Sequence, residues 1–131
     1  MNWTTNDIDA ARRRMGAKAP VPHAKAVRRT FHKAGEMNKT EAAYAAYLEL
    51  QKKTGLIADY RFEAVKLRLA DKTFYTPDFV VLAPDGVLEM HEVKGHWEDD
   101  ARVKIKVAAA QFPFKFVAVK KTKNGWDREV F

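Results

Sequence analysis

Between residues 59 and 94 the apolar residues follow a period of two, interrupted only by short turn sequences. Successive side chains of a strand point to opposite faces of a sheet, so this pattern predicts three strands, over residues 59–69, 74–82 and 87–94. Asp71-Lys72 forms the first predicted turn. Ala83-Pro84-Asp85-Gly86 forms the second, since Pro and Gly favour a tight hairpin. The chain must therefore build its fold around antiparallel strands.

Helical sequences lie on both sides of these strands. Asn38 or Thr40 can cap a helix that continues to Thr54 and is rich in good helix formers. A second helix is predicted over residues 97–111, and an apolar strand over 114–121 follows it. Because a helical crossover usually returns the chain to the sheet as a parallel strand, the sheet should be mixed. A late Asn-Gly pair indicates a final turn that one more strand could follow. The sequence thus predicts an α/β fold, with a mixed central sheet flanked by helices.

The positive charge is concentrated at the start of the chain. Residues 1–40 hold nine Lys and Arg but only three acids, a net charge of +6, whereas the rest of the chain contributes only +1. We expect residues 1–37 to form a basic arm with short helices over 5–15 and 25–36, because Pro and Gly separate these two segments. A basic arm favours a polyanion such as DNA, and a solubilising tail is the alternative. The candidate nucleic-acid-binding residues are Arg12, Arg13, Arg14, Lys25, Arg28, Arg29 and Lys33.

Composition excludes several classes of protein. The chain has no cysteine, which rules out disulfides and thiolate metal sites. It has no apolar run long enough to span a bilayer and no signal-peptide pattern at its start. We therefore expect a cytoplasmic protein without a membrane partner.

Three charged residues lie where apolar ones are expected. Asp78 continues the apolar face of its strand, and Glu92 and Lys94 continue that of the next strand. Asp78 and Glu92 flank the Ala83–Gly86 turn at similar distances, so they should be neighbours across the hairpin. Two adjacent carboxylates repel each other unless a cation or a proton lies between them. Mg²⁺ suits such a site, because it uses one or two carboxylates and keeps several waters.

Several further charged or polar residues have alternative possible roles. Glu41 lies on the apolar stripe of the first helix and could join the site, or it could only cap the helix. Glu63 could enter the site from the first strand. His91 faces away from Glu92, which favours a structural or solvated role. Glu92 and Lys94 could instead form a surface pair, or make an ion pair with Asp78.

Clustered carboxylates on a basic protein indicate metal-assisted hydrolysis of phosphodiesters. Lys94 could stabilise charge on the phosphate or help to deprotonate water. The sequences Thr76-Pro77-Asp78-Phe79 and Glu92-Val93-Lys94-Gly95 resemble the motif of the PD-(D/E)XK nucleases. The resemblance covers about residues 38–121 and is greatest to small phage-encoded endonucleases, including types that resolve Holliday junctions in DNA recombination.

The resemblance implies a restriction-endonuclease-like core over residues 38–131. It implies that Asp78, Glu92 and the backbone carbonyl of Val93 bind Mg²⁺ or Mn²⁺, that Lys94 is the catalytic lysine, and that Glu41 is a further catalytic acid. We expect a DNA endonuclease that is structure-directed or weakly sequence-selective. Cutting two strands needs two active sites, which favours a homodimer, and a phage protein would act in the host cytoplasm. The alternatives are a non-catalytic nucleic-acid-binding module on the same fold, a ribonuclease, and a nuclease subunit of a larger complex.

Overall fold

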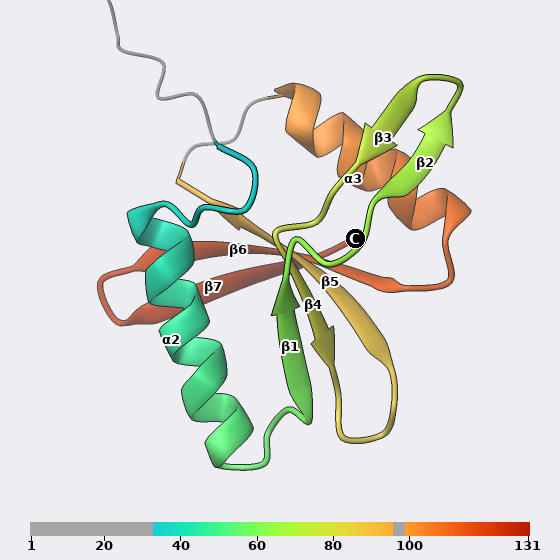
Figure 1. The fold of residues 1–131 in the computed structure, drawn as a ribbon. Coiled ribbons are helices and arrows are strands. Elements are labelled where there is room, and N and C mark those ends of the chain that lie inside the picture. Colours follow the sequence, from blue (N-terminus) through green and yellow to red (C-terminus); the bar gives the residue numbers. More distant parts are fainter. Residues whose placement is uncertain (1–32, 96–98) are drawn as a thin grey trace, which may run out of the picture. The chain divides into compact units, whose positions relative to one another are not determined.

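The computed structural model describes residues 33–95 and 99–131, which form an α/β structure with a mixed sheet (Figure 1). Its elements in chain order are α2 (Lys39–Lys53), β1 (Asp59–Phe62), β2 (Leu67–Ala70), β3 (Thr73–Tyr75), β4 (Phe79–Leu82), β5 (Leu88–Lys94), α3 (Asp99–Gln111), β6 (Lys115–Thr122) and β7 (Gly125–Val130). The main sheet has the strand order β1-β4-β5-β6-β7, and β2 and β3 form a separate pair. No helix in this described part is long and apolar enough to cross a membrane.

The predicted strands over 59–69 and 74–82 are each broken in two. The first breaks after β1 at Glu63, whose φ of 45° is a left-handed conformation that strand residues do not adopt. The second breaks at residues 76–78, where Pro77 has no N–H to donate to a sheet ladder. As a result, β2 and β3 leave the main sheet as a hairpin of their own, turning at Asp71-Lys72 as predicted.

The second predicted hairpin and the parallel crossover are confirmed. β4 and β5 are antiparallel, with Phe79 opposite His91, and the next step of this register places Asp78 opposite Glu92. Gly86 takes a φ of 86° in the connecting turn, a conformation that favours glycine. After α3 the chain returns as β6, which is parallel to β5, and the further strand β7 follows.

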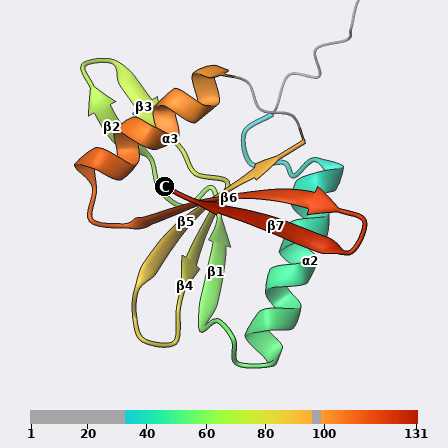
Figure 2. The same cartoon turned by 180° about the vertical axis from the view of Figure 1, so that it is seen from behind.

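The two helices pack against opposite faces of the sheet, as the alternation of the strand residues requires (Figures 1 and 2). Tyr44 and Leu48 of α2 pack against Phe79 and its neighbours on one face. Ile105 and Ala108 of α3 pack on the other, where the inner side of the β2–β3 hairpin completes the cluster. The start of α2 is confirmed at Asn38, the N-cap residue.

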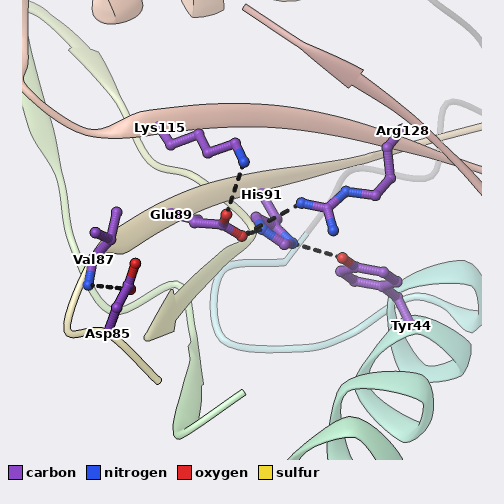
Figure 3. A network of polar contacts seen from close by, with 7 residues as sticks. All are labelled: Tyr44, Asp85, Val87, Glu89, His91, Lys115 and Arg128. Atoms are coloured by element: carbon purple, nitrogen blue, oxygen red, sulfur yellow. Dashed lines mark hydrogen bonds and ion pairs between the residues drawn. The ribbon is translucent and has the colours of Figure 1, made fainter. Parts of the chain in front are cut away.

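A polar network is buried beneath α2 (Figure 3). His91 is 2% exposed, and its Nδ1 lies 2.6 Å from Oη of Tyr44 while its Nε2 lies 2.8 Å from Glu89 Oε2. Lys115 and Arg128 contact the same carboxylate at 3.3 Å and 3.4 Å. Burial lowers the pKa of His91, although the hydrogen bond that its ring makes to the carboxylate of Glu89 opposes the shift. His91 therefore has a structural role rather than a solvated one.

The predicted helices of the arm fall almost wholly outside the described residues. Of the segment 25–36, only residues 33–36 are described, and they form a turn instead of a helix. The backbone N–H of Glu36 donates to the carbonyl of Lys33 at 3.0 Å, and Gly35 has a φ of 82°. A residue with this positive φ ends a helix, which accounts for the turn.

Candidate active site

A pocket of about 470 Å³ opens where β4 and β5 extend beyond their paired residues. The residues that line it come from five separate segments of the chain: Ala34, Glu41, Glu63, Thr76, Asp78, Glu92, Val93 and Lys94. They include every residue that the sequence indicates for catalysis or metal binding. The fold therefore brings together residues that are up to 60 positions apart in the chain.

Asp78 is held at the point where the β4–β5 ladder ends. Its Oδ2 accepts a 2.7 Å hydrogen bond from the backbone N–H of Val93, and its carbonyl accepts a 2.8 Å bond from the N–H of Glu63. No hydrogen bond from the described residues reaches its other carboxylate oxygen, Oδ1. The break after Pro77 thus places Asp78 with one oxygen fixed and one available to the pocket.

Glu92 is engaged at both oxygens. Its Oε2 accepts a 2.7 Å hydrogen bond from the hydroxyl of Tyr75, and its Oε1 lies 2.9 Å from Nζ of Lys94. The side chains of Lys94 and Glu92 are only 18% and 11% exposed, so this pair does not lie at the surface. Burial and the Glu92 charge raise the pKa of Tyr75, so its hydroxyl keeps the proton that it donates.

The surroundings of Asp78 disfavour its ionised form, because burial and nearby carboxylates outweigh the groups that stabilise a negative charge there. Burial raises the pKa of Asp78 to about 7, and the nearby negative charge of Glu92 contributes to the rise. Glu41 adds to it, while the N–H of Val93 and the ammonium of Lys94 oppose it. Asp78 and Glu92 therefore repel each other when both are ionised, and a cation between them would relieve that repulsion.

Glu41 has a place in both the helix cap and the pocket. Its N–H donates to Asn38 Oδ1 at 2.8 Å, and its Oε2 accepts from the N–H of Asn38 at 2.9 Å. This reciprocal pair is a capping box, which confirms the capping role. Glu41 is also 4% exposed and lines the pocket, so the sequence alternatives are not exclusive. Glu63 lines the same pocket and accepts a 2.8 Å bond from the N–H of Gly35.

The donor set fits a hard divalent cation that keeps much of its water. Within residues 33–95 and 99–131, no group of three or more Asp, Glu or His side chains is arranged to hold a metal ion. Mg²⁺ does not require such a group, because it is commonly bound through one or two carboxylates and waters. Asp78 and Glu92 supply two carboxylates to the pocket.

Among the described residues, none of the candidate nucleic-acid-binding residues of the arm lines this pocket, although Ala34 of the same arm does. Lys33 is exposed and pairs with Glu36 at 2.9 Å. The remaining arm candidates lie outside the described residues, namely Arg12, Arg13, Arg14, Lys25, Arg28 and Arg29.

Sequence reasoning missed Tyr75. A usable signal was present, because a buried tyrosine almost always has a hydrogen-bond partner for its hydroxyl. Tyr75 is 7% exposed and precedes the Thr76-Pro77-Asp78 sequence directly. Its partner Glu92 is 17 positions further along the chain.

No family model, curated protein or solved structure matches this chain. The chemistry of the pocket residues is therefore the basis of the functional interpretation.

Proposed function

We propose that the chain is a divalent-metal-dependent endonuclease of the PD-(D/E)XK class that hydrolyses phosphodiester bonds in DNA. One observation carries the proposal. Asp78 and Glu92 meet in a single pocket with Lys94, although all three are ionisable side chains of the kind that burial normally excludes. Two adjacent carboxylates repel each other in a structural ion pair, whereas a hard cation between them is stabilised by both.

The order of the elements supports the same class. The helix α2 precedes the antiparallel strands β1, β4 and β5, and α3 then connects to the parallel strand β6. This is the order expected of a restriction-endonuclease-like core. Residues 38–131 would form the nuclease domain, and residues 1–37 the basic arm.

Five of the pocket residues, together with Tyr75, have a role in the proposed reaction. Asp78 and Glu92, with the carbonyl of Val93, would hold Mg²⁺ or Mn²⁺. Such an ion polarises a phosphoryl oxygen and lowers the pKa of water. Lys94 would place its ammonium against the phosphate oxygens, where negative charge grows during hydrolysis. Tyr75 would orient Glu92 through its 2.7 Å hydrogen bond, and Glu41 would supply a further acid at the pocket wall.

The proposal is tested by incubating supercoiled plasmid and branched DNA with the protein in Mg²⁺ and then in EDTA. We expect cleavage in Mg²⁺ only, and a loss of about a hundredfold or more in the variants Asp78→Asn, Glu92→Gln and Lys94→Met. Asp85→Asn, in the β4–β5 turn, and Lys53→Met, at the end of α2, are matched controls that should keep full activity. Cleavage that persists in Asp78→Asn would remove the proposed site.

The arm is tested by the salt dependence of DNA binding. If Arg12, Arg13 and Arg14 contact phosphates, replacing all three by Ala should reduce the slope of log affinity against log salt by about 3. An unchanged slope would favour the solubilising tail. A homodimer in the host cytoplasm remains part of the proposal, and sedimentation with and without a DNA junction measures its stoichiometry.

A non-catalytic nucleic-acid-binding module is the second candidate. It is favoured by the engagement of both Glu92 oxygens, because Lys94 already supplies a cation to that carboxylate. DNA binding without cleavage in either Mg²⁺ or Mn²⁺ would support this candidate over the enzyme. Parallel RNA substrates distinguish a ribonuclease, and activity that requires added host extract would indicate a subunit of a larger complex.

A further inference from the structure

The β2–β3 hairpin has two different faces. Its inner residues Leu67, Leu69 and Tyr75 are buried in the cluster beneath α3. Gln111 of α3 also donates a 3.1 Å hydrogen bond to the carbonyl of Leu69. The hairpin is therefore fixed to the body of the protein by its inner side, and it extends away from the five-stranded sheet (Figure 1).

The outer residues of the hairpin combine positive charge with an exposed aromatic ring. Lys66, Arg68 and Lys72 are all exposed, and Asp71 is the one acid between residues 66 and 74. Arg68 lies directly opposite Phe74 across the strand pair. Phe74 is 40% exposed, although Nζ of Lys66 lies 4.4 Å from the centre of its ring. We call Lys66, Arg68, Lys72 and Phe74 the outer hairpin surface.

Core packing does not account for Phe74. The buried cluster takes the neighbouring Tyr75, and the alternation of the strand turns Phe74 outward. Proteins that bind single-stranded nucleic acid use this combination of groups: cations that follow the phosphates and an aromatic ring on which a base stacks. A base offers its face for stacking only when it is unpaired, because the duplex buries it.

Both strands of the hairpin lead along the chain from the outer hairpin surface to the proposed active site. After Phe74 come Tyr75, which donates to Glu92, and Thr76, which lines the pocket. Before Lys66 comes Glu63, which also lines the pocket. Two residues of extended chain span about 7 Å, so Phe74 lies close to Thr76 at the pocket rim.

We propose that the outer hairpin surface binds an unpaired stretch of nucleic acid beside the pocket, with Phe74 stacking on a base and the three cations contacting the flanking phosphates. The inference rests on the proposed function for the choice of a nucleic-acid partner. It goes further by naming the substrate class, a strand with unpaired bases next to the bond that is cut. The hairpin would thus select branched or single-stranded DNA over an intact duplex.

The test measures binding without turnover. Fluorescence anisotropy in EDTA compares a labelled single-stranded oligonucleotide with the same sequence as a duplex, using the full chain. Phe74→Ala and Phe74→Leu should bind the single strand about five- to hundredfold more weakly and bind the duplex as before. Phe74→Trp should retain single-strand binding, because the indole can also stack. Leu56→Ala is the control for an exposed apolar side chain, at 65% exposure, and thermal melts show that each variant folds.

The cations give a second, independent measurement. Arg68→Ala should lower the salt slope for the single strand by about 0.7, the value for one lost phosphate contact, and Lys53→Ala should leave it unchanged. Wild-type affinity in Phe74→Leu, equal losses on duplex and single strand, or no single-strand binding by the wild type would each overturn the inference. If binding depends on Phe74 but the protein cuts no substrate, the endonuclease is refuted and the proposed hairpin surface is retained. If the protein cuts DNA equally well with and without Phe74, the hairpin surface is refuted and the endonuclease is retained.

Discussion

The backbone N–H of Val93 donates a 2.7 Å hydrogen bond to Oδ2 of Asp78 and so joins two strands just beyond their last ladder pair. This bond holds the Asp78 carboxylate in place opposite Glu92. It stabilises the ionised form of Asp78, but burial and the Glu92 charge act more strongly in the opposite direction. The site is therefore assembled at a cost to the metal-free protein, and that cost is measurable.

We predict that the Asp78 carboxyl contributes a loss of stability to the metal-free protein as pH rises from about 4 to about 7. Asp78 has a pKa of about 7 in the folded protein and an ordinary value of 3.8, so the unfolded chain loses this proton first. Below 3.8 both states are protonated and the penalty is absent. Urea titrations in EDTA across this range should show the decline in the wild type and a smaller one in Asp78→Asn. Mg²⁺ at pH 8 should stabilise only the wild type, and identical pH slopes would contradict the prediction.

His91 should produce a pH dependence of the opposite sign. Its pKa is lowered by burial in the folded protein, so the unfolded chain takes up a proton more readily as pH falls below the ordinary value of 6.5. The contribution of His91 to the free energy of unfolding should therefore decrease from pH 7.5 towards pH 5, and it is measured as the difference in slope between the wild type and His91→Gln. In His91→Gln this part of the slope should disappear, whatever the stability of the variant at pH 7.5. A slope that His91→Gln leaves intact would show that other groups are responsible.

Tyr75→Phe should weaken the apparent affinity for Mg²⁺ about tenfold, because removing a group that orients a metal-binding carboxylate typically costs ten- to a hundredfold. Activity should recover at saturating Mg²⁺. Tyr60→Phe is a matched control. The hydroxyl of Tyr60 donates a 2.8 Å hydrogen bond to Glu49, and neither residue lines the pocket. Metal titrations of cleavage give both values. Equal effects of the two variants would mean that Tyr75 matters only for folding.

The capping role of Glu41 can be separated from its proposed role in the pocket by replacing the residue with Gln. Gln also serves at this position of a capping box, so Glu41→Gln should unfold within about 0.5 kcal/mol of the wild type. Glu41→Ala removes the side-chain cap and should cost about 1 kcal/mol. If Glu41 acts in the pocket, both variants should lose cleavage about tenfold or more. Full activity in Glu41→Gln would assign Glu41 to the cap alone.

Local sequence information was sufficient for the elements that depend on neighbours. The start of α2 follows from Asn38 and Glu41, which are three residues apart and satisfy each other. The β4–β5 hairpin follows from its turn, and its register determines that Asp78 and Glu92 face each other. Both carboxylates of the candidate site could be predicted from the sequence for this reason.

Features that depend on contacts between distant parts of the chain could not be predicted from the sequence. The break at Glu63 is maintained by a hydrogen bond to the carbonyl of Asp78, 15 positions away, and no periodic pattern encodes it. Pro77 did signal the second break, because a proline inside a strand pattern argues against a continuous strand. The sequence placed His91 on the correct face of β5. Its partners Tyr44 and Glu89 were not identified, since Tyr44 is 47 positions away.

Consecutive side chains of β5 enter two unrelated surroundings, which makes the length of this strand more critical than its composition. The side chain of Glu92 contributes to the pocket, whereas the side chains of His91 and Val93 lie in the layer beneath α2, although Val93 also borders the pocket. One inserted or deleted residue would exchange these two sets, sending a carboxylate under the helix and an apolar side chain into the pocket. In-frame loss of a single codon from β5 would therefore damage both faces of the sheet at once, whereas replacing one side chain by another of similar backbone preference changes only the face to which that residue points.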